Sequence, residues 1–407
     1  MPDHIHPKLQ HLSSQELETL ISRYYGDEKV AALLIEYQID CTAGQLCSLF
    51  PPLQLDQRCP YCSVRMIQKR GSRSSTYNSS AVICPKCTHQ KGRYRCQCDN
   101  CIAIEAQKKR LESERLKAAI NTHLDRLRLQ NTKHPSVNEL DLRSAVSLLA
   151  LIRACLFSDH PSHEPLDASE MTLNALEEAT IPYTPRGNLS DQLIENLRKM
   201  RLIEFSANST PDALTLENGR LVSFIPSKVR WTLLMPEPHT YFEELVFVAE
   251  TQSRWPTHWE ADVHDVWLEI ALAECKEYCA HINAERGLPE PGAKSLDSML
   301  RNLLQNYSVA QCYQVLYVSA QRAVDFWVRT RCNKRHAANY MIGECQRRAD
   351  RARAENWEVK PFRRNFDLPR SSLSHVFFDV FLKIGEAGFN QAHGTLKYPY
   401  SQFEASF

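Results

Sequence analysis

Four cysteines in two Cys-Pro-x-Cys pairs are the residues of this sequence best suited to chemistry. The first pair is Cys59 and Cys62, the second is Cys84 and Cys87, and 21 residues separate the two pairs. Zinc binds four tetrahedral ligands and accepts thiolates among them. Because each Cys-x-x-Cys turn places two sulfurs on one side of a tight bend, the two pairs predict one zinc ion. Four protein ligands leave no position for a catalytic water, so the predicted site is structural.

A second group of candidate ligands follows closely and consists of His89, Cys96, Cys98 and Cys101. These residues predict a second zinc of the Cys3His type, with free thiols or a different sharing of ligands as the alternatives. Nine of the 15 cysteines fall between Cys41 and Cys101, and no export signal is visible near the N-terminus. We therefore expect a cytoplasmic protein whose thiols bind metal rather than form disulfides.

The ligand pattern from Cys59 to Cys87 resembles that of a zinc ribbon. From Arg58 to Cys98 the sequence has nine Lys or Arg residues and no Asp or Glu. Unbalanced positive charge suits contact with nucleic-acid phosphates. The basic residues expected to make this contact are Arg65, Lys69, Arg70, Arg73, Lys86, Lys91, Arg93 and Arg95. The alternative is a solvated basic face that packs on the acidic stretch 237–297.

Three short helices are predicted before the cysteine pairs. Ser13 and Glu16 have the spacing of a capping box at the start of the first helix. Residues 27–37 predict the second helix from their apolar spacing. Thr42 and Gln45 have capping-box spacing again, at the start of the third helix.

The stretch VAALLIEYQIDCTAGQLCSLF within these helices resembles the homeodomain-like helix-turn-helix of resolvases and transposases. The resemblance implies DNA contacts from the third helix, through Thr42, Gln45 and Ser48. This helix departs from the usual pattern because it has no Arg or Lys for reading bases. Three helices of this pattern also suit a module that contacts protein.

The sequence as a whole predicts a multi-domain fold that is mainly α with small β parts. Helices followed by a β-hairpin favour a winged helix in the middle of the chain, with a generic α+β domain as the alternative. No apolar run reaches the roughly 18 residues that span a membrane. The predicted segments are 1–55 (helix-turn-helix), 56–104 (zinc ribbon with one or two zinc ions), 105–135 (charged linker helix), 136–238 (winged-helix-like domain) and 239–407 (α-helical domain).

One enzymatic interpretation rests on the string RTRCNKRH in the C-terminal segment. Arg331 and His336 have the R-x4-H spacing of the helical HEPN ribonucleases, and this resemblance implies an RNA-cleaving site. Cys332 departs from that pattern, because the family usually has a polar residue there. A basic surface that is solvated or binds phosphate is the alternative, and no P-loop, HExxH or GxSxG motif is present.

These observations lead to three hypotheses. The first is a zinc-containing nucleic-acid-binding protein without its own catalysis, with duplex DNA as the expected partner. It would act as a bacterial-type regulator or as an accessory protein of a mobile-element or phage-defence system, with protein partners on the helical C-terminal segment. The second is an RNA-cleaving effector, and the third is a scaffold whose zinc modules bind protein.

Overall fold

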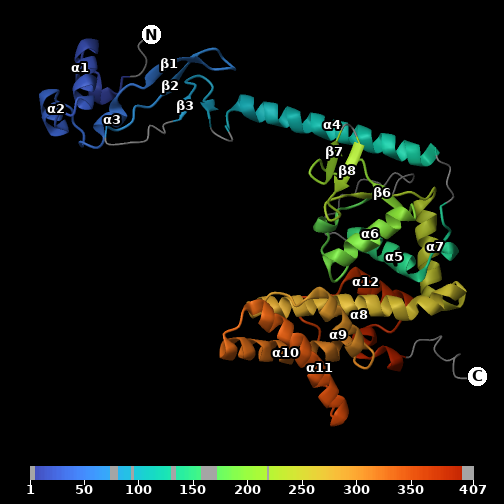
Figure 1. Cartoon of the computed structure of the whole chain (residues 1–407). Coiled ribbons are helices and arrows are strands. Elements are labelled where there is room, and N and C mark those ends of the chain that lie inside the picture. Colours follow the sequence, from blue (N-terminus) through green and yellow to red (C-terminus); the bar gives the residue numbers. More distant parts are fainter. Residues whose placement is uncertain are drawn as a thin grey trace, which may run out of the picture. The chain divides into compact units, whose positions relative to one another are not determined.

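The computed structural model describes residues 5–73, 81–92, 96–129, 134–156, 172–217 and 220–396. The chain forms two compact units, Met1–Glu112 and Ser113–Phe407. The described residues are mainly helical with small antiparallel sheets, which agrees with the predicted fold class (Figure 1). None of the helices in these ranges is both long enough and apolar enough to cross a membrane.

The first unit begins with a small helical core. A short 3-10 turn (Pro7–Leu9) precedes α1 (Ser14–Tyr25) and α2 (Val30–Glu36). The predicted capping box is present at α1, where Ser13 and Glu16 each accept the other's main-chain N–H. The buried side chains of this core are Leu9, Leu17, Leu20, Tyr24, Leu33, Ile39, Leu46, Cys47 and Phe50.

The third helix is shorter than predicted, because α3 is the single turn Leu46–Leu49. The Thr42 N–H donates to Gln45 Oε1 at 3.2 Å, so one half of the predicted capping contact exists. The main chain around Gly44 forms turns instead of a helix, in line with the low helix propensity of glycine. Pro51 ends the helix, because a proline disfavours the helical conformation of the residue before it.

A four-stranded antiparallel sheet of order β1-β2-β3-β4 follows in the first unit. Its strands are β1 (Leu53–Arg58), β2 (Arg65–Gln68), β3 (Val82–Ile83) and β4 (Gln90–Lys91). The first Cys-Pro-x-Cys turn links β1 to β2, and the second links β3 to β4. The sheet therefore positions both turns.

The helix α4 (Asp99–Leu129) crosses the division between the two units, whereas the sequence predicts a linker of residues 105–135. In the second unit, Leu116, Ile120 and Leu124 are buried in the main core. Their spacing of four residues puts them on one side of the helix. Leu111, by contrast, is 48% exposed. The second half of α4 is therefore part of a domain core.

Short helices and strands alternate in the middle of the chain. In chain order they are η2 (Val137–Glu139), α5 (Leu142–Leu156), β5 (Thr172–Leu173), η3 (Leu176–Glu178), α6 (Gly187–Lys199), β6 (Ile203–Phe205), β7 (Leu214–Glu217), β8 (Arg220–Phe224) and β9 (Trp231–Leu233). The strands β5, β9 and β6 form a sheet in that order, and β7 pairs with β8 as a separate hairpin.

The C-terminal part is helical. Its elements are α7 (Pro238–Glu250), η4 (Gln252–Arg254), α8 (Thr257–Glu285), α9 (Ala293–Leu304), α10 (Val309–Thr330), α11 (Lys334–Ala354), α12 (Ser372–His375), a π-helical turn (Val376–Phe381), α13 (Ala387–Asn390) and η6 (His393–Thr395). The helix α8 lies between α5 and α6 on one side and α9 and α10 on the other (Figure 1). One buried core contains residues of both predicted segments, 136–238 and 239–407.

Candidate metal centres

The two Cys-Pro-x-Cys turns have the same main-chain structure. In the first turn, the Cys59 N–H donates to the Val64 carbonyl at 2.9 Å, and the Ser63 N–H donates to the Cys59 carbonyl at 3.0 Å. The second turn repeats both bonds from Cys84, at 2.8 and 3.0 Å. Ser63 and Thr88 occupy the same position of their turns and share a left-handed φ of 55°. Each turn therefore directs its two thiols to one side.

The sulfurs of the first group lie at the separations of a tetrahedral site. Cys59 Sγ lies 3.5 Å from Cys87 Sγ, and Cys62 Sγ lies 3.2 Å from Cys84 Sγ and 3.6 Å from Cys87 Sγ. A tetrahedron with Zn–S bonds of about 2.3 Å has sulfur–sulfur edges of about 3.8 Å. All four sulfurs lie within 4.8 Å of one another. The group is thus suited to zinc with only a small outward movement of the thiols.

Main-chain N–H groups of the second turn favour the thiolate form of Cys84. Burial by itself raises the pKa of this thiol, but the N–H groups of Cys87 and Lys86 and the Cys62 thiol lower it to about 6. The Cys62 thiol shows the opposite change, since its bond to Cys84 and its burial raise its pKa to about 12. The second turn therefore favours a thiolate at Cys84, and a bound cation would favour deprotonation of the other thiols.

The second group brings together all four predicted ligands. His89, Cys96, Cys98 and Cys101 place one ligand atom each within 4.8 Å of the others. Cys101 Sγ lies 3.3 Å and Cys98 Sγ lies 3.8 Å from Nδ1 of His89. Cys101 belongs to the first turn of α4, where the Ile102 N–H donates to the Cys98 carbonyl. The donor set is again suited to zinc, and each group supplies four protein ligands, as structural sites do.

Tyr61 connects the two groups and was not identified from the sequence. It lies inside the first Cys-Pro-x-Cys turn, yet its hydroxyl is 3.3 Å from Cys101 Sγ of the second group. Its ring also meets the His89 imidazole edge-on, with centroids 4.9 Å apart. Its position between two candidate ligands could have identified it in the sequence, because a polar side chain beside a metal site often hydrogen-bonds a ligand.

Two arginines beside the first turn occupy opposite positions on neighbouring strands. Arg58 and Arg65 are direct cross-strand partners in β1 and β2. The Arg65 side chain is 57% exposed, and its nearest carboxylate, Asp56, lies 4.0 Å away and is fully exposed. The Arg58 guanidinium donates to the Ser63 carbonyl, at 3.0 Å. Like charges in opposite positions destabilise a sheet, so an external anion would stabilise this pair.

The other predicted basic residues have several different environments. Lys86 is exposed on the second turn, and Lys91 is exposed with its Nζ donating to Gln57 Oε1 at 2.9 Å. Lys69 is exposed at the end of β2. Arg93 and Arg95 lie outside the described residues.

Arg70 and Arg73 make contacts within the first unit that the sequence does not reveal. Nε of Arg70 donates to the Pro51 carbonyl at 3.0 Å. The Arg73 guanidinium donates to the carbonyls of Tyr24 and Glu28 and lies over the Tyr24 ring. These bonds attach the end of the ribbon to the helical core, so both arginines have a structural role.

The predicted contacts of the third helix lie on an exposed turn. Thr42, Gln45 and Ser48 are all exposed, and the Ser48 hydroxyl donates to the Gln45 carbonyl at 2.7 Å. Ser48 lines a cleft of about 600 Å³ together with Lys69 and Arg70. The structure therefore brings one residue of the helical module next to two of the ribbon.

Arg331 and His336 lie at the turn between α10 and α11. Arg331 caps α10 in a left-handed conformation with a φ of 52°, and the His336 N–H donates to Asn333 Oδ1 at 2.8 Å. Both side chains are exposed. The His336 imidazole stacks on Phe326.

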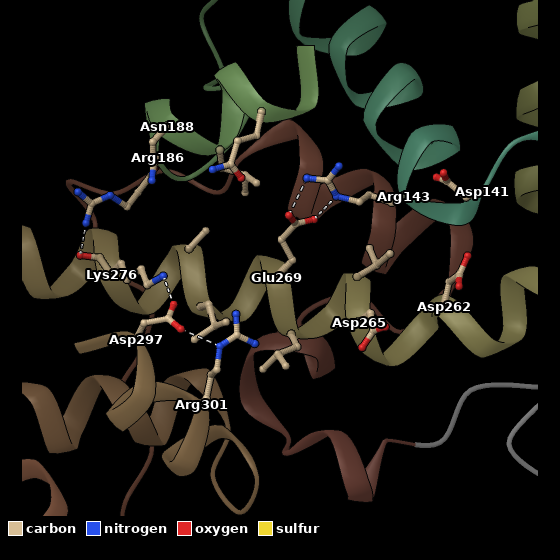
Figure 2. A pocket seen from close by; sticks show the side chains of 16 residues that line it. Asp141, Arg143, Arg186, Asn188, Asp262, Asp265, Glu269, Lys276, Asp297 and Arg301 are labelled. Carbon is tan, nitrogen blue, oxygen red and sulfur yellow. Dashed lines mark hydrogen bonds and ion pairs between the residues drawn. The ribbon is translucent and has the colours of Figure 1, made fainter. Parts of the chain in front are cut away.

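A separate cavity of about 650 Å³ lies in the second unit among α5, α6, α8 and α9 (Figure 2). Its cations hold carboxylates: Arg143 pairs with Glu269 at 2.8 Å, and Lys276 and Arg301 both bond Asp297. Arg186, on the same wall, pairs with Glu290 at 3.1 Å. Among the described residues this lining therefore offers no unpaired cation for an anionic ligand. The sequence patterns did not identify this cavity, since its residues come from distant segments.

The comparisons with known proteins give no match to a family model, to a curated protein or to a solved structure.

Proposed function

We propose that the first unit is a zinc-dependent nucleic-acid-binding module whose ribbon contacts the phosphate backbone. The carrying observation is the cross-strand pair Arg58 and Arg65, which lies directly beside the first metal group and has only the exposed Asp56, at 4.0 Å from Arg65, as an ion-pair partner among the described residues. A phosphate placed between two guanidinium groups would relieve their repulsion and form charge-assisted hydrogen bonds. Lys86 and Lys91 add exposed positive charge on the second turn and on β4.

Duplex DNA is the partner we propose, bound with little sequence preference. Specific base readout uses an element that enters the major groove, most often with arginine. The single-turn α3 is too short for that role, and Thr42, Gln45 and Ser48 bring no cation. Ser48, which lines the cleft with Lys69, suits contact with a phosphate or sugar instead. Both the ribbon and the helical core would thus contact the backbone of the duplex.

The middle segment supports a scaffold role more than a second DNA contact. Its order of helix, strand, helix, strand, hairpin and strand resembles a winged helix, in which α6 would be the helix for DNA. Arg198 of α6, however, is held by Glu204 at 3.1 Å and lies over the Phe205 ring. A regulator, or an accessory protein of a mobile-element or phage-defence system, is the setting we propose for such a chain, from its order of modules alone.

A salt series with the double variant Arg58→Ala/Arg65→Ala tests the proposal. The assay is fluorescence anisotropy of a labelled DNA duplex with the full chain. Loss of two phosphate contacts should weaken binding and reduce the slope of log K against log salt by about two. Lys199→Ala/Lys228→Ala removes the same charge from the second unit and should leave the slope unchanged. An equal slope for the native chain and the arginine variant would refute the proposal.

A further inference from the structure

The turn between α10 and α11 is positively charged and has no function in the proposal above. The sequence has no Asp or Glu from residue 326 to residue 343. Four exposed cations occupy this stretch: Arg329, Arg331, Lys334 and Arg335. Two of them contact neutral groups, since Arg335 donates to the Glu290 carbonyl at 2.8 Å and Lys334 lies over the Trp327 ring at 5.2 Å. Their charge is therefore available to an anion.

Aromatic rings are stacked between the same two helices. Phe326 of α10 stacks on Tyr340 of α11, with centroids 4.1 Å apart and planes 7° apart. Phe326 also stacks on His336, one turn earlier in α11, at 5.6 Å and 22°. At the other end, the Arg347 guanidinium lies over the Tyr340 ring at 5.2 Å. The two helices thus place these side chains in one stack.

His336 is the exposed end of this stack. Phe326 covers one face of its imidazole, and among the described residues no other ring or cation is placed over it. Because the His336 side chain is exposed, a further planar ring could stack on it. Arg329 and Arg331 lie on the adjoining last turn and cap of α10, where they can reach the charged groups of a ligand whose ring stacks on His336.

We propose that this turn binds single-stranded nucleic acid, with a base stacked on His336 and the neighbouring phosphates held by Arg329 and Arg331. Proteins bind single strands through positive surfaces with aromatic stacking partners, because every base offers a flat face. Bases in a duplex already stack on each other and leave no face free. An acidic peptide would use the cations but not the ring. The site is separate from the ribbon, and the inference does not rest on the proposed function of the first unit.

The test uses the whole chain carrying Arg58→Ala/Arg65→Ala. These changes reduce the contribution of the ribbon to nucleic-acid binding. Anisotropy is measured with a labelled oligo(dT) strand and with an abasic strand of the same length and charge. His336→Ala should weaken oligo(dT) binding about fivefold or more, because stacking of one base is lost, and should leave the abasic strand unchanged. His336→Phe should restore oligo(dT) binding, since it keeps a flat ring.

The charged part of the site has its own variant and control. Arg329→Ala/Arg331→Ala should weaken binding of both strands and lower the salt dependence. Arg351→Ala, on the exposed side of α11 and paired with Glu355, should change neither strand. Circular dichroism checks that each variant is folded. The inference is overturned if His336→Ala binds oligo(dT) as the parent does, if it weakens both strands equally, or if polyglutamate competes as well as oligo(dT).

Discussion

Replacement of Cys84 by serine should unfold the ribbon around the second turn while the rest of the chain stays folded. The ribbon has little core of its own, since Met66 is the one fully buried apolar side chain beside the sulfurs among its described residues, and the partly buried Val82 packs against it. Burial of these two side chains contributes at most about 3–6 kcal/mol. Zinc binding in small modules contributes roughly 10–16 kcal/mol. Most of the local stability should therefore be lost with the first metal.

Two measurements on one sample follow this loss. Elemental analysis should show about two zinc ions in the native chain and one or fewer in Cys84→Ser. Hydrogen exchange should become fast in residues 81–92, while α1 and α2 keep their protection through their own core. The second unit should also be unchanged, and its state can be followed separately because all six tryptophans lie in it.

Cys41→Ser is the matched control, because Cys41 is a partly buried cysteine outside both groups. It should keep the native zinc content and exchange pattern. Undiminished zinc in Cys84→Ser would refute the assignment of this residue as a ligand. A tryptophan signal of unfolded protein in the same variant would show that the second unit does not fold independently of the ribbon.

Two further predictions concern the second unit, both measured by urea unfolding followed by tryptophan fluorescence. Ile120→Ala should destabilise this unit by about 2–4 kcal/mol, because Ile120 is completely buried, whereas Leu111→Ala should have little effect; equal effects would contradict the anchoring of α4. Burial, with the nearby Glu274 carboxylate, raises the pKa of Glu277 from 4.5 to about 7, so its ionisation destabilises the native state as pH rises through this range. Glu277→Gln should accordingly match the native chain at pH 4 and exceed its stability by about 1–2 kcal/mol at pH 8, after allowance for partial exposure; an equal difference at both values would contradict the shift.

Local patterns carried most of what the sequence could predict. The Cys-Pro-x-Cys spacing is a property of a single turn, so the first group could be found without knowing the fold. The same holds for the capping box of Ser13 and Glu16, whose partners are three residues apart. His89 was found by its short distance from the cysteines along the chain. The mainly helical class followed from apolar periodicity, which is also local.

Contacts between distant segments account for what the sequence could not predict. Arg70 and Arg73 lie in a basic stretch that suggests phosphate binding. Their actual partners Pro51, Tyr24 and Glu28 are 19 to 49 residues away along the chain. The apolar side of α4 was similarly hidden, because its buried side depends on where the second unit packs. The ion pairs of the second-unit cavity join residues up to 126 positions apart.

The contact of Tyr61 with Cys101 would couple the two groups if both bind zinc. Metal in the first group would then order the turn that carries Tyr61, and this turn offers its hydroxyl to a candidate ligand of the second group. By reciprocity, metal in the second group must favour the ordered first turn to the same extent. The fraction of chains with a single zinc ion should therefore be smaller than two independent sites would produce. A cell with limited zinc would then contain mostly filled and empty modules, so the ribbon would respond to zinc supply more steeply than a single site could.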